Sequence, residues 1–283
     1  MSFSPVWLAL REPVDHRARN RDIARQVAAR FAGAGSVRVV DLGCGTGSNL
    51  RATAGLLPAR QEWMLVDYDP VLLSEARKAL TLWAGAAREE GETLVLAKAG
   101  RTIRVIFRWA DLNADLDAIL ETAPDLVTAS ALFDLVSDDY IATFARKVAA
   151  RRAAFYTVLT YDGQDAFQPP HPQDAAVIAA FGAHQGGDKG FGPAAGPRAA
   201  DALGRAFSAA GHDVSEGDSP WRIGPDDAAL ATPLLDGIAA AVRETGRLPE
   251  TAISDWLAFR QRKALRPDGL IVTGHRDTFA VPG

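Results

Sequence analysis

Residues 37–49 read VRVVDLGCGTGSN, a short strand-like run that ends in an acid and is followed by glycines at alternate positions. A strand that runs into a glycine-rich turn is typical of a nucleotide-type cofactor site in an α/β sheet. A dinucleotide fingerprint, Gly-x-Gly-x-x-Gly, would place its third glycine at position 48, but the chain has Ser48 there. The glycines are Gly43, Gly45 and Gly47 instead. Because glycine-rich turns vary, this spacing alone leaves the cofactor open.

Charge discriminates better between the candidate cofactors. Acids stand at the expected carboxyl ends of the strands, where ligands bind in open α/β sheets. A pyrophosphate is an anion that prefers helix N–H groups with no carboxylates nearby. S-adenosylmethionine carries a sulfonium, an ammonium and one carboxylate, so its net positive charge suits an acidic rim. The acids of this expected rim are Asp41, Asp67, Asp69, Asp111 and Asp134.

Each part of S-adenosylmethionine can be matched to residues of this rim. The glycines let the backbone approach the methionine tail, and Asp41 can orient its ammonium directly or through water. Asp67, at the end of the second strand, can accept both ribose hydroxyls. Asp111 offers a carboxylate for the adenine amine, and Leu112 offers an apolar wall. Asp69 is placed to be the N-cap of the following helix.

The rest of the chain alternates between strand-like and helix-like segments. Apolar residues at four-residue spacing predict a first helix over 14–33, and Gly91 predicts the end of a helix that starts at Pro70. Two β-rich runs predict a hairpin over 93–112. Such alternation indicates helices on both faces of a mainly parallel sheet. The other expected strands are 63–69, 123–130, 153–163, 212–223 and 269–280, and the other expected helices are 48–57, 137–152, 198–210, 227–245 and 250–264.

Four stretches occur in an order that resembles one protein family. VVDLGCGTGSN, LVDYDP, WADL and PDLVTASALFDLVS resemble the consecutive motifs of class I S-adenosylmethionine-dependent methyltransferases, over residues 35–165. The resemblance implies an α/β fold with a Rossmann-like, mainly parallel sheet of seven strands, whose last two strands form an antiparallel edge pair. It also implies a methyltransferase that uses S-adenosyl-L-methionine. The candidates for cofactor binding are Asp41, Gly43, Gly45, Gly47, Asn49, Asp67, Tyr68, Asp111, Leu112 and Ser130.

This resemblance organises the chain as one methyltransferase domain over 1–283. Residues 1–34 are expected to be an N-terminal helical segment, and 35–161 the cofactor-binding core. Residues 162–198 are rich in glycine and proline but contain the apolar run DAAVIAAF, so they predict an insertion that caps the substrate site. The insertion resembles one in a group of bacterial methyltransferases without an assigned substrate. Residues 199–283 are expected to supply the C-terminal helices and edge strands.

Candidates for catalysis and substrate binding follow the fourth and fifth strands. Asp134 lies in a turn expected to face the transferred methyl group, where it could act as a base or hold the acceptor. Its alternative role is to cap the helix that begins near Ser137. Tyr161 points toward the same crevice by topology, and it too could act as a base or hold the acceptor by hydrogen bonds. In the insertion, His184 and Lys189 are candidates for substrate recognition.

Composition and charge limit the partners. A net charge of −4 and the lack of a basic, aromatic-interleaved stretch disfavour a nucleic acid, so we expect a small-molecule acceptor. The arginines that precede or lie on the first helix predict an exposed basic face, and the alternative is that one of them meets the carboxylate of the cofactor; they are Arg11, Arg17, Arg19 and Arg21. The single cysteine, Cys44, and histidines at no ligand spacing predict no metal site. With no leader-like or membrane-spanning stretch, we expect a cytoplasmic protein. The sequence specifies neither the acceptor nor the oligomeric state.

Three other functions stay open. One is an NAD(P)-dependent oxidoreductase on a similar sheet, although Ser48 and the acidic rim count against it. Another is a transferase of the same fold that moves an aminopropyl or carboxymethyl group, which an arginine poised for an added carboxylate would mark. The third is a non-catalytic subunit that binds S-adenosylmethionine and transfers nothing.

Overall fold

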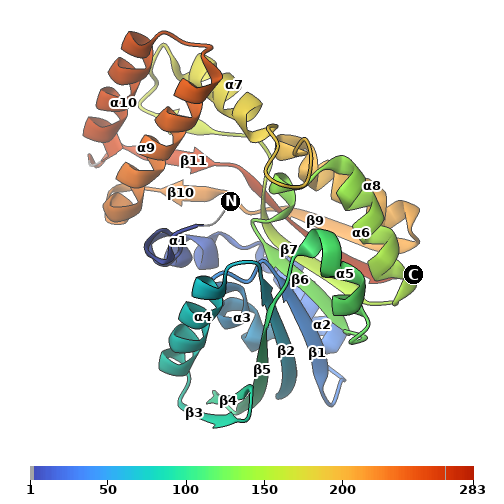
Figure 1. Cartoon of the computed structure of the whole chain (residues 1–283). Coiled ribbons are helices and arrows are strands. Elements are labelled where there is room, and N and C mark those ends of the chain that lie inside the picture. The colour runs from blue at the N-terminus through green and yellow to red at the C-terminus, as the bar shows by residue number, and fades with distance from the viewer. Residues whose placement is uncertain (1–2, 265) are drawn as a thin grey trace.

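The computed structural model describes residues 3–264 and 266–283. Its centre is a nine-stranded sheet (Figure 1). In spatial order the strands are β3 (Ala86–Glu90), β4 (Thr93–Lys98), β5 (Arg101–Trp109), β2 (Arg60–Asp67), β1 (Val37–Leu42), β6 (Leu126–Ser130), β7 (Ala154–Tyr161), β12 (His275–Pro282) and β9 (His212–Asp218).

The predicted mainly parallel, Rossmann-like sheet is confirmed. Strands β5, β2, β1, β6 and β7 run parallel to one another. At one edge β12 runs antiparallel to both β7 and β9, which is the expected antiparallel pair. At the other edge β3 and β4 add two antiparallel strands, so the sheet has nine strands rather than the seven predicted.

The strand β3 lies where the sequence predicted the end of a helix. Helix α4 (Pro70–Trp83) stops well before Gly91, and the residues that follow form β3. Gly91 has a φ of 60° and lies in the turn between β3 and β4, so its role as a helix C-cap was predicted wrongly. All five residues of β3 are exposed and three are charged, so nothing in this stretch alternates as a half-buried strand does.

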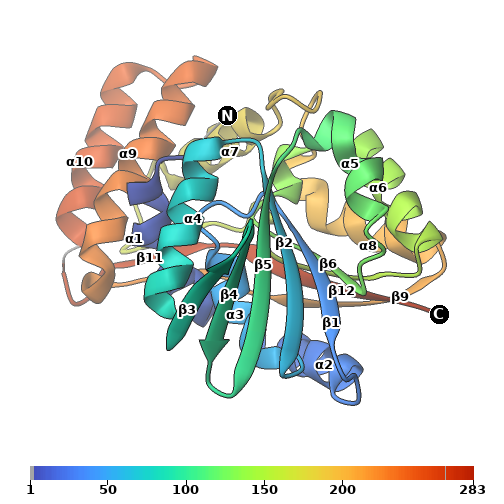
Figure 2. The same ribbon diagram turned by 60° about the horizontal axis from the view of Figure 1, so that its bottom comes forward.

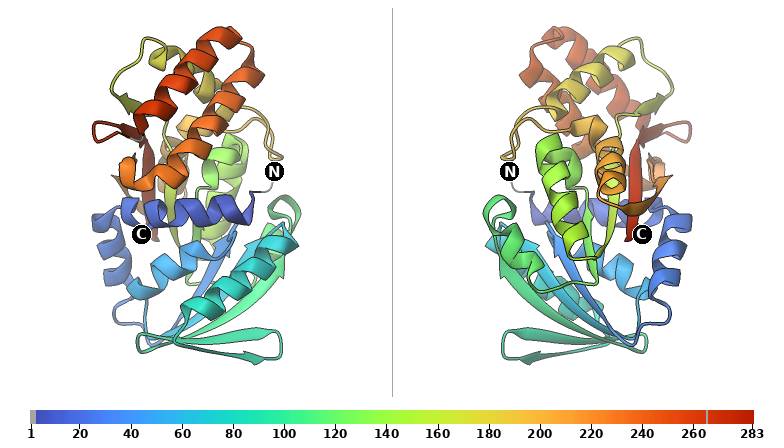
Figure 3. Two further views of the ribbon diagram at one scale, coloured as in Figure 1. Left: turned by 90° about the vertical axis from the view of Figure 1, so that its left-hand side faces the viewer. Right: turned by 90° about the vertical axis from the view of Figure 1, so that its right-hand side faces the viewer.

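The first helix predicted over 14–33 is two helices. Helix α1 (Pro5–Ala18) ends at Arg19, whose ψ of 138° breaks the helical path, and α2 (Arg21–Phe31) starts afresh. The Oδ1 atom of Asn20 caps α2 by accepting hydrogen bonds from the amides of Asp22 and Ile23. Because of this break, α1 leaves the sheet and lies beside the glycine turn (Figures 1 and 3).

Helices cover both faces of the sheet (Figure 2). Successive strand residues alternate between the two apolar layers: Val39 packs in the layer with α2, and Val40 packs in the layer on the other face. Helix α2, α3 (Ser48–Thr53) and α4 belong to the first layer. The second layer contains α5 (Leu112–Leu120), α6 (Asp138–Ala150) and α8 (Ala199–Ala209).

A separate layer stands above the carboxyl ends of the strands (Figures 1 and 3). We call it the cap, and it contains a three-stranded sheet and three helices. Strand β8 of the segment 162–198 pairs with β11, so the cap is formed by this segment together with residues from the C-terminal third of the chain. The elements of the cap are β8 (Ala166–Gln168), β10 (Trp221–Ile223), β11 (Leu270–Thr273), α7 (Asp174–Gln185), α9 (Ala228–Thr245) and α10 (Glu250–Ala264).

Two strands predicted as single runs pass from the main sheet into the cap. The run 212–223 is divided into β9 and β10, and the run 269–280 is divided into β11 and β12 at Gly274. A side chain at Gly274 would collide with Asp162, whose amide donates a hydrogen bond to the Gly274 carbonyl at 3.2 Å. These two crossings fix the cap to the edge of the main sheet.

Candidate cofactor and acceptor site

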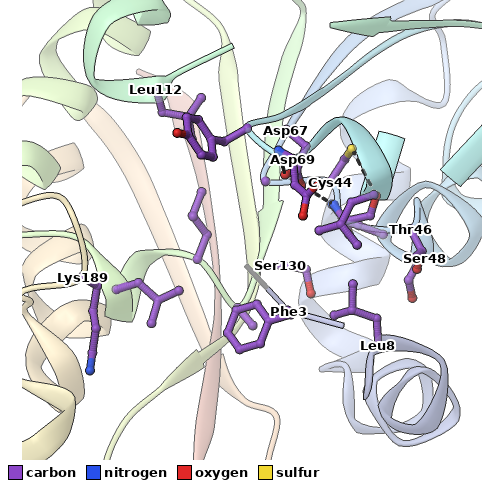
Figure 4. Close-up of a pocket in the computed structure, with 18 of the residues that line it drawn as sticks. Phe3, Leu8, Cys44, Thr46, Ser48, Asp67, Asp69, Leu112, Ser130 and Lys189 are labelled. Atoms are coloured by element: carbon purple, nitrogen blue, oxygen red, sulfur yellow. Dashed lines mark hydrogen bonds between the residues drawn. The ribbon is translucent and has the colours of Figure 1, made fainter. Parts of the chain in front are cut away.

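A cavity of about 430 Å³ opens at the carboxyl ends of β1, β2, β5 and β6 (Figure 4). Its walls come from α1, the glycine turn, the strand ends and the loop 189–191. The residues that line it are Phe3, Leu8, Arg11, Asp15, Gly43, Cys44, Gly45, Thr46, Ser48, Asn49, Asp67, Tyr68, Asp69, Leu72, Asp111, Leu112, Asn113, Ser130, Ala131, Leu132, Leu135, Lys189, Gly190 and Phe191.

The glycine turn presents backbone to this cavity. Gly43 and Gly45 line it, with φ angles of 62° and 53° that favour glycine. A Cβ atom on Gly45 would lie 3.1 Å from a Leu8 methyl group of α1, so the turn and α1 are in close contact. Gly47 does not line the cavity. A Cβ atom there would lie 3.4 Å from Leu80 in α4, so Gly47 permits close packing on the core side.

Asp67 ties the end of β2 to the glycine turn. Its Oδ2 atom accepts a hydrogen bond from the Gly45 amide at 2.8 Å, and its Oδ1 atom accepts one from the Asp69 amide at 3.0 Å. Burial raises the pKa of Asp67. A carboxylate has about four lone-pair sites, so Asp67 keeps acceptor capacity toward the cavity that it lines. Asp69 accepts a hydrogen bond from the Val71 amide at 2.8 Å, which is the predicted N-cap.

Asp41 does not reach the cavity surface. It is fully buried, and its Oδ1 atom accepts a hydrogen bond from the Asn49 side chain at 2.7 Å. Its Oδ2 atom has no hydrogen-bond partner among the described residues. Burial raises the pKa of Asp41 to about 7, even though the hydrogen bond from Asn49 lowers it. Asn49 does line the cavity, so Asp41 contacts a cavity-lining residue from below the surface.

Residues after β2, β5 and β6 complete the predicted cofactor side. Tyr68, Asp111, Leu112 and Ser130 all line the cavity. Asp111 also caps α5, because its Oδ1 atom accepts a hydrogen bond from the Asn113 amide at 2.9 Å. Tyr68 is 65% exposed and lies at the mouth, where its ring is near the exposed Trp109. The structure therefore brings most of the predicted cofactor residues together.

Helix α1 supplies a wall that sequence reasoning missed. Leu8, Arg11 and Asp15 line the cavity from one face of this helix, as expected of residues three and four apart. The prediction that Arg11 lies on an exposed basic face was wrong, since its side chain is only 11% exposed. Its Nε atom donates a hydrogen bond to Asp15 Oδ2 at 2.9 Å. The spacing of Leu8, Arg11 and Asp15 was the available signal, but α1 has no apolar stripe to mark its inner face.

Asp134 and Tyr161 lie behind the cavity surface. Asp134 is buried, its Oδ1 atom has no partner among the described residues, and burial raises its pKa to about 6. It does not cap α6: the Ser137 hydroxyl accepts the hydrogen bond from the Tyr140 amide, so that alternative was wrong. The Tyr161 hydroxyl donates to Asp165 at 2.5 Å, and burial raises the pKa of Tyr161. A role in catalysis stays a prediction for both.

Of the two candidates for substrate recognition in the insertion, one lines the cavity and the other does not. Lys189 lines the cavity, whereas His184 lies on α7 with its Nε2 atom 3.0 Å from a carboxylate oxygen of Glu244 in α9. Within residues 3–264 and 266–283, no group of three histidine, cysteine, aspartate or glutamate side chains could hold a metal ion. Cys44 lines the cavity as a buried thiol, and burial raises its pKa. No helix in the same residues is long and apolar enough to span a bilayer.

Comparison with known proteins agrees with this fold. No family model matches the sequence, and no curated protein matches it. The cyclopropane-fatty-acyl-phospholipid synthase-like protein from Lactobacillus casei is similar in structure, with a TM-score of 0.50 and 17% identity over 95% of this chain and 99% of that chain. The cyclopropane synthase MmaA2 from Mycobacterium tuberculosis has a TM-score of 0.48 and 11% identity, over 98% and 94% of the two chains. The mycolic acid cyclopropane synthase CmaA1, complexed with SAH and CTAB, has a TM-score of 0.46 and 12% identity, over 91% and 83%.

Identities this low show the fold alone. The chain has the fold of the class I S-adenosylmethionine-dependent methyltransferases, with the mainly parallel sheet and the helices on both faces that this class shares.

Proposed function

We propose that this protein is an S-adenosylmethionine-dependent methyltransferase that acts on a small molecule. The observation that carries the proposal is the pairing of the Gly45 amide with the Asp67 carboxylate at the cavity wall. A turn built for pyrophosphate leaves its amides free for the phosphate oxygens and keeps carboxylates away. Here a carboxylate already occupies one of those amides, which favours a cofactor with a nucleoside and a positive charge. This argues against the NAD(P)-dependent alternative.

Most of the catalysis would come from holding the acceptor in line with the methyl group. Methyl transfer from a sulfonium is a displacement with a good leaving group, and correct orientation can supply roughly 7–11 kcal/mol. A base is needed only for an acceptor that is protonated at the working pH. Asp134, which is buried and has a raised pKa, is the candidate for that base, because its neighbours Leu132 and Leu135 line the cavity. Tyr161 is the weaker candidate because its hydroxyl is engaged with Asp165.

The size of the cavity supports a small acceptor. The cavity of about 430 Å³ is bounded by α1 and by the loop 189–191, and it is of the size that small-molecule sites have. The net charge of −4 disfavours a nucleic acid.

Calorimetric titration with S-adenosylmethionine, S-adenosylhomocysteine and NADH tests the cofactor. We expect the first two to bind and NADH not to bind. The variant Asp67→Ala should weaken S-adenosylhomocysteine binding by about 100-fold, since it removes two charge-assisted hydrogen bonds to the ribose. Asp117→Ala, on the exposed face of α5, is the matched control and should bind normally. Tight NADH binding without a response to the other two ligands would overturn the proposal.

A screen for methyl transfer distinguishes the enzyme from a binding subunit. The protein would be incubated with radiolabelled S-adenosylmethionine and pools of small acceptors. Transfer of label to any pool establishes the enzyme. Normal cofactor binding with no transfer to any pool would favour the non-catalytic alternative.

A further inference from the structure

The cavity has charges of opposite sign at its two sides. The acids Asp67, Asp69 and Asp111 gather at the ends of β2 and β5, on the proposed nucleoside side. Two cationic side chains, Arg11 and Lys189, also line the cavity. Lys189 lies across the cavity from Asp67 and Asp69 (Figure 4). The proposed cofactor accounts for the acids, and its one carboxylate can pair with only one of the two cations.

Arg11 belongs to the side of the cavity that faces β6 and the cap. Its guanidinium lies 5.0 Å from the centre of the Trp221 ring in the cap strand β10. Burial raises the pKa of Asp134 after β6 and lowers that of His275 at the start of β12, and the nearby charge of Arg11 is a smaller effect that lowers both values. At Asp41 near the end of β1, the cation that lowers the pKa is Arg19 and not Arg11. Arg11 is therefore placed near the expected acceptor rather than near the nucleoside.

The guanidinium of Arg11 keeps donors available. Its Nε and Nη2 atoms donate to the two oxygens of Asp15, at 2.9 and 3.3 Å. Its Nη1 atom has no hydrogen bond to any of the described residues, although it carries two N–H groups. Lys189 has no ion pair within residues 3–264 and 266–283. The N–H groups of Nη1 are therefore available to an anionic acceptor in the cavity.

The cavity also has apolar walls. Leu8 lies one turn before Arg11 on α1, and Phe3, Leu132, Leu135 and Phe191 are further apolar residues that line the cavity. A ligand that fills this side buries hydrocarbon against these side chains and places its polar end at Arg11. Such a shape fits an aromatic or branched aliphatic acid.

We propose that Arg11 anchors the carboxylate of the methyl acceptor, which is a small carboxylic acid with an apolar body. Lys189 adds a second positive charge to the cavity wall. This inference rests on the proposed function, because it names the acceptor class of that site. A carboxylate is preferred to a phosphate because the charge of Arg11 is already shared with Asp15, so the remaining attraction suits a monoanion better than a dianion.

The test measures ligand binding and needs no knowledge of the true acceptor. Protein saturated with S-adenosylhomocysteine would be titrated with 4-hydroxybenzoate, phenylacetate and isovalerate, each compared with its primary amide. We expect at least one acid to bind about 10-fold to 100-fold more tightly than its amide, which is the effect of one charge-assisted hydrogen bond. Arg11→Gln should remove this preference. Arg25→Gln, on the exposed side of α2, is the matched control and should retain it.

The double variant Arg11→Gln/Asp15→Asn is a second test in case Arg11→Gln alone does not fold. It removes the buried ion pair as a unit, so no uncompensated carboxylate stays behind. Equal binding of every acid and its amide would overturn the proposal. So would a loss of S-adenosylhomocysteine binding in the Arg11 variants with no acid preference in the wild type, because Arg11 would then hold the carboxylate of the cofactor. Failure of S-adenosylhomocysteine to bind the wild type would instead refute the proposed function, and the acids would then be compared on the unliganded protein.

Discussion

Replacing Asp41 by asparagine should change how the stability of the protein depends on pH. Asp41 is fully buried at the end of β1, one of its oxygens has no partner among the described residues, and its pKa is raised to about 7. The folded state therefore holds a proton on Asp41 at pH values where the unfolded chain has lost it. The stability that this proton provides is fully present below pH 3.8 and is lost as the pH rises through about 7.

The size of the effect follows from the two pKa values of Asp41. Between the ordinary value of 3.8 and about 7, the full loss is about 4 kcal/mol. In the accessible window from about pH 5.5 to pH 8, the loss is about 2 kcal/mol. Asn at position 41 cannot ionise, so this part of the loss is absent from the variant. Asn also leaves buried donors without partners, but that cost does not depend on pH.

The assay is urea unfolding of the wild type and of Asp41→Asn at pH 5.5 and pH 8. Other buried acids also titrate in this window, Asp134 and Asp165 among them with pKa values of about 6. Their contributions are common to both proteins and cancel in the difference between them. We expect the variant to gain about 2 kcal/mol relative to the wild type on going from pH 5.5 to pH 8. A difference that stays constant across this window would refute the argument that Asp41 is protonated in the folded state near neutrality.

Two further substitutions test the glycine turn and the cap. Gly45→Ala places a Cβ atom at a φ of 53° and against α1, so it should weaken S-adenosylhomocysteine binding by about tenfold in a calorimetric titration; Gly55→Ala, which meets nothing within 4 Å, should not. Asp174→Ala strands the guanidinium of Arg260, which is 2% exposed and bound to Asp174, and should lower the free energy of unfolding by about 3–5 kcal/mol in urea. The exposed Asp255→Ala should change it by less than about 0.5 kcal/mol, and an equal loss in both aspartate variants would contradict the buried ion pair.

The cofactor side of the cavity was predictable because strand ends determine it. In a parallel sheet the carboxyl ends of successive strands meet at one edge, so residues such as Gly45, Asp67 and Asp111 come together whatever the loops do. Asp41 was placed on the wrong side of the surface, because it lies within β1 and its side chain turns to Asn49 under the cavity. The sequence predicts where a strand ends, but it does not predict which side chains at that end line the cavity.

The elements that could not be predicted depend on partners far away in the sequence. Strand β3 is exposed over its whole length, so only its pairing with β4 makes it a strand. Asp134 follows β6 as expected, but Ser137 takes the capping role and leaves Asp134 buried. The cap combines the insertion with β10 and β11, which are parts of runs that looked like single long strands.

Helix α1 explains why the acceptor is harder to infer than the cofactor. It is fastened to the glycine turn side by the ion pair of Glu12 with Arg51 at 2.5 Å, and to the cap by the hydrogen bond from Trp221 to Asp15 at 2.9 Å. A helix held on both sides shows no single apolar stripe, so its inner face looks like surface in the sequence. Yet this inner face carries Arg11, between the cofactor turn and the cap. The proposed recognition of the acceptor would therefore rest on an element whose sequence says little about what it contacts.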